Sequence, residues 1–218
     1  MPSTQPQRPY NVKYYQRNRQ REIDRVLTRQ RATLAFLRDV RRVPCMDCGR
    51  TFLPHQMDFD HREPSNKSFQ VTDARAMLAP RSRLLEEIAK CDVVCATCHA
   101  VRTYAQQAKR WAQRRADGKL INTPRHEAKR KRSTRRRDFL LALRDRPCSD
   151  CGRRPPPCVM QFDHRDARDK KFNVAESWCR SESKIFEEAA KCDIVCPNCH
   201  RDRSFRRRQR TAGVAQFG

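Results

Sequence analysis

The sequence lacks any long run of apolar residues. Its longest apolar run is Phe139 to Leu143 in a chain of 218 residues, far short of the roughly 20 residues that span a bilayer. The opening stretch, MPSTQPQRPYNVKYYQRNRQ, contains no apolar segment either, so we expect no signal peptide. These absences favour a protein of the reducing cytosol that has no membrane partner.

Apolar residues are scarce throughout the chain. Hydrophobic residues make up 37% of the sequence and charged residues 34%, which is little material for one large core. Two small domains of roughly 60 residues each would be marginal on apolar burial alone and would need a covalent or metal staple. Twelve cysteines are present, and in a reducing compartment paired C-x-x-C motifs favour metal over disulfides.

Acidic residues are few compared with basic ones. The chain has 25 Asp and Glu against 49 Lys and Arg, a formal net charge of +24, and most of the basic residues are Arg. Guanidinium groups bind phosphate in a bidentate fork and stack on bases. The composition therefore predicts a nucleic-acid partner, with a solvated and highly charged surface as the alternative.

The sequence contains a duplication. PCMDCGRTFLPHQMDFDHREPSNKSFQV, from Pro44, aligns without gaps with PCSDCGRRPPPCVMQFDHRDARDKKFNV, from Pro147, and 15 of the 28 positions are identical. EEIAKCDVVCATCH, from Glu86, matches EEAAKCDIVCPNCH, from Glu187, at 10 of 14 positions. Two copies indicate a tandem duplication, since a solenoid needs three or more repeats.

The repeat divides the chain into five predicted segments. They are a basic helical arm (1–42), a first module (43–104), a basic helical linker (105–135), a second module (136–206) and a tail (207–218). Each module reads as a zinc knuckle, a β-hairpin, a loop, a helix, a second knuckle and a final helix. Helical spacing places Cys91 and Cys192 on the apolar face of the module's first helix, as packing residues.

The remaining paired cysteines form two matched sets. Four thiolates complete the tetrahedral coordination of Zn²⁺, so each set predicts a closed, structural zinc site. Disulfides are the competing interpretation. The sets are Cys45, Cys48, Cys95 and Cys98 in the first copy, and Cys148, Cys151, Cys196 and Cys199 in the second.

A histidine follows the last cysteine of each set, and an Asp-His pair ends the strand-like run of each copy. In the first copy these residues are His99 and the pair Asp60 and His61. Neighbouring helical residues point about 100° apart, so Cys98 can face the zinc while His99 faces the strand. This predicts a second, open metal site beside each zinc.

These motifs resemble those of HNH endonucleases with the ββα-metal fold, in the form stapled by a four-cysteine zinc. The resemblance covers about 60 residues of each copy. It implies small α+β zinc-bound domains, arranged as two tandem, treble-clef-like modules that basic helices join and precede. It also implies a catalytic Mg²⁺ or Mn²⁺ in each copy, with Asp60 and His99 as ligands and His61 as general base, and with Asp163, His200 and His164 in the same roles.

One departure from the family pattern concerns its central Asn, which is not evident here. Lys90 and Lys191 stand near its place, and we interpret them as supporting residues that brace the active-site loop or contact phosphate. Arg62 and Arg165 directly follow the proposed bases and are candidate phosphate clamps. The alternative for each Arg is an ordinary surface cation.

The resulting hypothesis is a metal-dependent endonuclease that hydrolyses double-stranded DNA and nicks opposite strands with its two sites. Two alternatives stay open: a non-catalytic tandem zinc protein that binds nucleic acid, and an RNA-directed nuclease. Two fused modules reduce the need for a dimer, so a monomer is the expected state. The resemblance implies the cytoplasm of a bacterial or phage-infected cell, and phage packaging, a mobile element and restriction stay open as the biological role.

Overall fold

The structure is a computed structural model that describes residues 12–73, 78–118, 123–177 and 180–214. The first eleven residues of the predicted arm, residues 119–122 of the linker and the last four of the tail lie outside these ranges. The chain divides into two compact units, which are Met1–Val40 with His61–Asp92, and Arg41–Asp60 with Val93–Gly218. Each unit is described by itself.

The described residues of the first unit include the helices α1 (Val12–Val40) and α3 (Arg81–Ile88) and the short 3-10 turn η2 (Pro64–Asn66). Helix α1 forms the described part of the predicted basic helical arm. The guanidinium of Arg81 lies over the ring of Phe36, 3.2 Å from its centroid, and so links α3 to α1.

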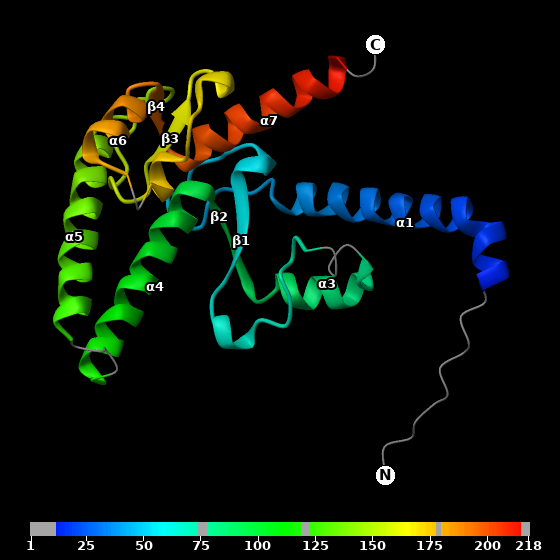
Figure 1. The fold of residues 1–218 in the computed structure, drawn as a ribbon. Helices are drawn as coiled ribbons and strands as arrows, with labels where there is room; N and C mark the ends of the chain where they lie inside the picture. Colours follow the sequence, from blue (N-terminus) through cyan, green and yellow to red (C-terminus); the bar gives the residue numbers. More distant parts are fainter. Residues whose placement is uncertain (1–11, 74–77, 119–122, 178–179, 215–218) are drawn as a thin grey trace. The chain divides into compact units, whose positions relative to one another are not determined.

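The remaining helices and strands belong to the two copies of the repeat and are labelled in Figure 1. Its elements in the first copy are η1 (Pro54–Gln56), β1 (Met57–His61), β2 (Cys91–Cys95) and α4 (Ala96–Ala116). The second copy has α5 (Pro124–Arg144), β3 (Gln161–His164), η3 (Ala167–Asp169), η4 (Val174–Glu176), α6 (Glu182–Ala189), β4 (Cys192–Val195) and α7 (Pro197–Val214).

Each copy forms one small antiparallel sheet, β1 with β2 and β3 with β4, so the architecture is a small α+β fold in repeated units. In the second copy Gln161 pairs with Val195 and His164 with Cys192. The predicted local hairpin is therefore wrong, because the strand that ends in the Asp-His pair pairs with a strand about 30 residues later in the chain.

Cys91 and Cys192 are buried, as predicted, but each is the first residue of a strand and not part of a helix. Helix α3 ends at Ile88. The residues that follow, CDVV and CDIV, are rich in the β-branched types that fit a pleated surface. Each helix ends shortly before a strand begins, and the cysteine at the start of the strand happens to continue the helical spacing of the apolar residues.

Small apolar clusters surround the cysteine sets. One contains Cys45, Met57, Val94 and Cys95, and the other Cys148, Met160, Ile194, Val195 and Cys196. Gly49 and Gly152 close the first knuckle of each copy with φ of +67°, a left-handed conformation that favours glycine. The backbone N–H of each donates to the carbonyl of the first cysteine over 2.9 Å.

The two copies contact each other within the second unit through buried Asn198. Its side-chain oxygen accepts a hydrogen bond from the backbone N–H of Thr97, and its carbonyl accepts one from the side-chain amide of Gln56, both over 3.0 Å. Asn198 is the repeat counterpart of Thr97. The junction between the copies is therefore built around two equivalent positions.

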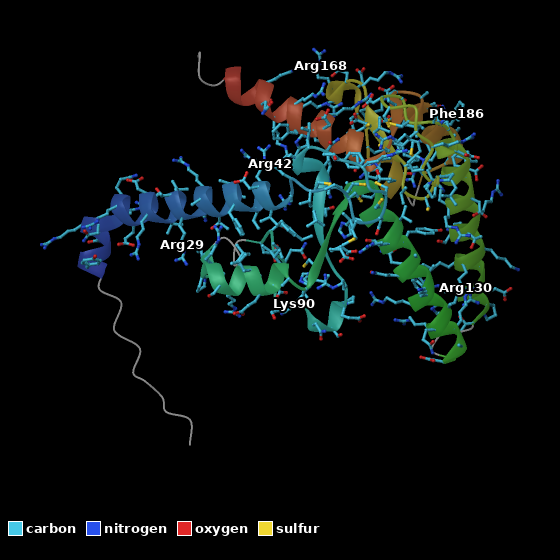
Figure 2. The ribbon with its side chains drawn as sticks, turned by 180° about the vertical axis from the view of Figure 1, so that it is seen from behind. Arg29, Arg42, Lys90, Arg130, Arg168 and Phe186 are labelled. Atoms are coloured by element: carbon cyan, nitrogen blue, oxygen red, sulfur yellow. The ribbon has the colours of Figure 1, made fainter. Side chains whose placement is uncertain are left out.

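The predicted basic linker is largely helical. Helix α4 ends at Ala116, and Gly118 follows with φ of +64°, a left-handed conformation that favours glycine just after a helix. Thr123 then caps α5 by accepting from the backbone N–H of His126. Figure 1 shows α4 and α5 side by side, and Figure 2 shows basic side chains along α1 and α5, with Arg29 and Arg130 labelled.

The segment predicted as a tail from residue 207 is helical as far as Val214, because α7 continues through it. Within the described ranges, none of the helices combines the length and the hydropathy that crossing a bilayer requires.

Candidate metal centres and catalytic site

Each four-cysteine set gathers in space as its spacing predicted. The four sulfur atoms of each set lie within 4.8 Å of one another. The Sγ atoms of Cys151 and Cys196 are 3.9 Å apart, and a tetrahedral zinc with bonds of about 2.3 Å would hold two sulfurs about 3.8 Å apart. Both sets therefore fit structural zinc.

The first cysteine of each set is prepared to act as a thiolate. Burial alone would raise the pKa of Cys45 and of Cys148, but backbone N–H groups that point at each sulfur outweigh it and lower both pKa values to about 7. The N–H of Cys95 donates to Cys45 Sγ over 3.2 Å, and that of Cys196 donates to Cys148 Sγ over 3.3 Å. Thiolates are the form that binds zinc.

The two residues predicted to bind the second metal ion lie close together in each copy, as an Asp-His pair. The Nε2 atom of His200 lies 3.6 Å from Oδ1 of Asp163, and the Nε2 atom of His99 lies 3.7 Å from Oδ1 of Asp60. These separations exceed a hydrogen bond. Two ligands placed about 2.1 Å from one ion would lie about 3.0 Å apart at an angle of 90° and about 3.6 Å apart at 120°. A carboxylate and an imidazole are donor types that bind divalent ions, and their separations lie at the wide end of this range.

An arginine from the last helix of each copy holds the aspartate of this pair. Arg203 Nη1 donates to Asp163 over 2.9 Å, and its Nε donates to Asp150, inside the first knuckle, over 2.8 Å. In the first copy Arg102 bridges Asp60 and Asp47 in the same way. Sequence reasoning missed these residues, although all of them recur in the repeat.

The second copy adds another cation to its aspartate. Arg207 donates to both carboxylate oxygens of Asp163 over 2.8 Å. Burial alone would raise the pKa of Asp163, but the bonds from Arg207 and Arg203 outweigh it and lower the pKa. Gln106 stands at the counterpart of Arg207 in the first copy. Asp163 therefore bonds to two arginines, Arg203 and Arg207, whereas the bonds described for Asp60 come from Arg102.

The first copy instead braces its histidine. The Nδ1 atom of His99 lies 2.8 Å from Oδ2 of Asp58, and the guanidinium of Arg201 grips both oxygens of Asp58 over 2.7 Å. Burial alone would raise the pKa of Asp58, but these bonds lower it to about 2, and the bond to Asp58 raises the pKa of His99. A carboxylate on the second ring nitrogen is typical of metal-binding histidines, because it orients the ring.

The described residues of the second copy include no such brace. Gln161 and Ala100 stand at the counterparts of Asp58 and Arg201. Burial lowers the pKa of His200 against the opposing effect of Asp163, so this imidazole is neutral near pH 7 and able to bind a metal. Sequence analysis missed Asp58 because the duplication does not repeat it.

A buried glutamate holds the proposed base of each copy. His164 Nε2 lies 2.9 Å from Glu188 Oε1, and in the first unit His61 Nε2 lies 2.8 Å from Glu87 Oε1. An ionised carboxylate only accepts hydrogen bonds, so Nε2 is the donor. In a neutral ring the lone pair is then on Nδ1. Nδ1 is then the ring nitrogen that can accept a proton.

These glutamates remain ionised despite their burial. Burial alone would raise the pKa of Glu188, but donors from Lys191, the backbone of Lys171 and His164 outweigh it and lower the pKa to about 2. The same balance, with Lys90 as the first donor, lowers the pKa of Glu87 to about 2. A charged residue kept in both copies on an otherwise apolar helix face was the sequence feature that could have revealed them.

Lys90 and Lys191 serve the same glutamates. Lys90 Nζ lies 2.7 Å from Glu87 Oε2, 3.0 Å from Ser68 Oγ and 3.2 Å from the carbonyl of Asn66. Lys191 Nζ lies 2.7 Å from Glu188 Oε2. Each ammonium thus ties the glutamate to the loop that precedes the helix. Bracing of an active site and contact with phosphate both stay predictions for these lysines.

Arg62 and Arg165 direct their donors at backbone. The guanidinium of Arg62 donates to the carbonyls of Cys91, over 3.0 Å, and Ala89, and that of Arg165 donates to the carbonyls of Cys192, over 3.1 Å, and Ala190. The bonds to Ala89 and Ala190 cap the C-terminal ends of α3 and α6, and the two arginines also pair with the carboxylates of Asp92 and Asp193. The guanidinium groups are about half exposed, and their predicted contact with phosphate stays a prediction.

Comparison of the chain with protein-family models, with curated proteins and with solved structures finds no match. The chemistry of the site therefore follows from its own residues and their geometry.

Proposed function

We propose that this protein is a metal-dependent endonuclease that hydrolyses DNA, built as two ββα-metal modules of the HNH type. One observation carries the proposal. In both copies an Asp and a His lie at the spacing of two metal ligands, 3.6 and 3.7 Å apart, directly beside a four-cysteine set. A zinc staple alone does not require this pair.

The residues of the second copy divide the chemistry among them. Asp163 and His200 would hold Mg²⁺ or Mn²⁺, which when bound offsets charge on the phosphoryl oxygens. His164 accepts a proton from water at Nδ1, and Glu188 stabilises the imidazolium that results. Asp60, His99, His61 and Glu87 are the counterparts in the first copy.

The partner follows from charge. The net charge of +24 and the exposed arginines of α1 and α5 suit a polyanion that contacts the protein over a long surface. The proposed partner is double-stranded DNA, with one nick made in each strand.

A second candidate is a non-catalytic zinc protein that binds nucleic acid. The observation that favours it is the pairing of Asp163 with both Arg203 and Arg207. A carboxylate already satisfied by two guanidinium groups has a structural role without any metal. Under this reading the Asp-His pairs stabilise the modules only.

The deciding experiment incubates zinc-loaded protein and supercoiled plasmid with Mg²⁺, Mn²⁺ or no added divalent ion. We expect nicking only with the divalent ion. His164→Ala and His61→Ala should each yield open circles with few linear molecules, and the double variant should yield neither. His126→Ala removes an exposed histidine of α5 and is the matched control.

The outcomes separate the candidates. Binding of plasmid without nicking under every condition would establish the non-catalytic reading. Full linearisation by one single variant would show that the other copy does all the cutting. A parallel incubation with structured RNA tests the RNA-directed alternative, which preferential cleavage of RNA would support.

A further inference from the structure

The two copies differ in the space beside their metal-binding histidines. In the first copy this space is filled by contacts with α7. The ring of His55 stacks on Phe205, with centroids 4.1 Å apart, and bonds to Asp202 over 3.0 Å. Arg201 grips Asp58 next to it.

In the second copy the corresponding space is open. The repeat replaces His55 by Cys158, Asp58 by Gln161 and Arg201 by Ala100. A cavity of about 460 Å³ lies here, between α4 and the strand β3. Its lining includes Tyr104, Arg144, Cys158, Gln161, Asn173 and His200.

Arg144 is the charged group of this cavity. Its guanidinium lies over the ring of Phe162, 4.9 Å from the centroid, and burial lowers its pKa. Its Nε atom is buried and has no hydrogen-bond partner among the described residues. The Arg144 side chain is partly buried, and an anion beside it would offset the cost of that burial.

The first copy has a carboxylate near the corresponding arginine. Arg41, the counterpart of Arg144, lies over Phe59 at the same distance of 4.9 Å. Its Nε also lacks a partner among the described residues, so this atom does not distinguish the copies. Burial lowers the pKa of Arg41 as well; the nearby carboxylate of Asp58 opposes this effect, and the guanidinium of Arg201, which grips Asp58, adds to it. The second copy has neither the carboxylate nor this guanidinium at the corresponding positions.

We propose that the cavity of the second copy is a phosphate-binding subsite, which a phosphate group of a nucleotide occupies where the first copy has the Asp58 carboxylate. Arg144 provides the charge, while Gln161 and Asn173 provide polar groups at the wall. The volume is that of a small-ligand site and leaves room for the sugar and base beside Tyr104. That this nucleotide belongs to a DNA substrate rests on the proposed function; the binding of phosphate does not.

The test measures binding of thymidine 5′-monophosphate to the full, zinc-loaded chain without added Mg²⁺ or Mn²⁺, by calorimetry at 0.15 M salt. Thymidine without phosphate is the comparison ligand. We expect one site at which the nucleotide binds at least about tenfold more tightly than the nucleoside, the size of a charge-assisted hydrogen bond. Equal binding of the two ligands would overturn the proposal.

Three variants locate the site. Gln161→Asp installs the carboxylate of the first copy, and Arg144→Ala removes the cation; each should weaken binding about tenfold or more. Arg146→Ala removes an exposed arginine two residues away, outside this cavity, and should change affinity less than about twofold. Equal losses with Arg144→Ala and Arg146→Ala, or no loss with Gln161→Asp, would show general attraction to a basic surface and refute the subsite.

Zinc content of each variant shows whether its fold is retained, and Gln161→Asp decides the matter if Arg144→Ala fails to fold. Plasmid nicking is assayed in parallel. Nucleotide binding that depends on Gln161 and Arg144 without any nicking would leave the subsite standing and refute the proposed function. Nicking without that dependence would do the reverse.

Discussion

Replacement of Glu188 by Gln tests whether one buried carboxylate organises the second copy. Its Oε1 atom accepts from His164 Nε2 and from the backbone N–H of Lys171 over 2.9 and 2.7 Å, and its Oε2 accepts from Lys191 Nζ over 2.7 Å. The residue is 1% exposed. Gln keeps the shape but replaces one acceptor oxygen by a donor NH₂ group, which then faces another donor.

Two arguments give the same size of effect. Removal of one member of a buried, hydrogen-bonded charge pair costs about 3–5 kcal/mol. The pKa of Glu188, lowered from 4.5 to about 2, corresponds to about 3 kcal/mol of stability. Because the folded-state pKa is the lower one, this stability is complete above about pH 4.5 and disappears as the pH falls toward 2. We expect a loss of about 3 kcal/mol at neutral pH.

The assay is hydrogen exchange at the amides of Lys171 and Phe172, which point at the carboxylate, together with denaturant unfolding of the zinc-loaded chain. A loss of 3 kcal/mol accelerates exchange by opening about 150-fold. Glu187→Gln makes the same change of charge at the exposed neighbouring position and should cost less than about 0.5 kcal/mol. A cost below about 1 kcal/mol for Glu188→Gln, or equal costs for the two variants, would refute the reasoning.

Three further predictions concern metal and DNA. The zinc-loaded chain should contain two zinc ions and release them as the pH falls well below the pKa of about 7 of Cys45 and Cys148, which a zinc-binding dye measures; less than one zinc per chain would contradict the staple. Arg207→Gln, which installs the residue of the first copy, should tighten Mn²⁺ binding in the second copy about tenfold by electron paramagnetic resonance, whereas the exposed Arg208→Gln should not. The affinity for duplex DNA should fall steeply with salt and weaken when residues 1–30 are removed; a flat dependence would contradict binding through the phosphate backbone.

The sequence predicted those parts of the fold that depend on residues close together in the chain. The apolar spacing of α1, the left-handed glycine of each C-x-x-C-G knuckle and the strand before each Asp-His pair all follow from neighbouring residues. The partner of that strand does not, because β1 and β3 pair with segments on the far side of a loop and a helix. Register across such a distance is decided by tertiary packing.

The candidate site was predictable to the same extent. The duplication identified Asp163 and His200, because ligand types recur in register. It could not identify Asp58, whose importance comes from a contact with Arg201 of the other copy, or the burial of Glu188. A glutamate on a short helix is expected in water, and only the assembled set of donors explains why it is buried and charged.

The junction around Asn198 has a consequence for what mutation can do to this molecule. Two identical subunits that meet across a twofold axis must accept every substitution twice. Here Thr97 and Asn198 occupy equivalent positions in one chain, yet differ and bond to each other directly. Because α4 and α5 join the two copies in one chain, a residue of one copy can change while its counterpart stays the same. The first copy can therefore carry the carboxylate of Asp58 where the second copy has Gln161 and a cavity.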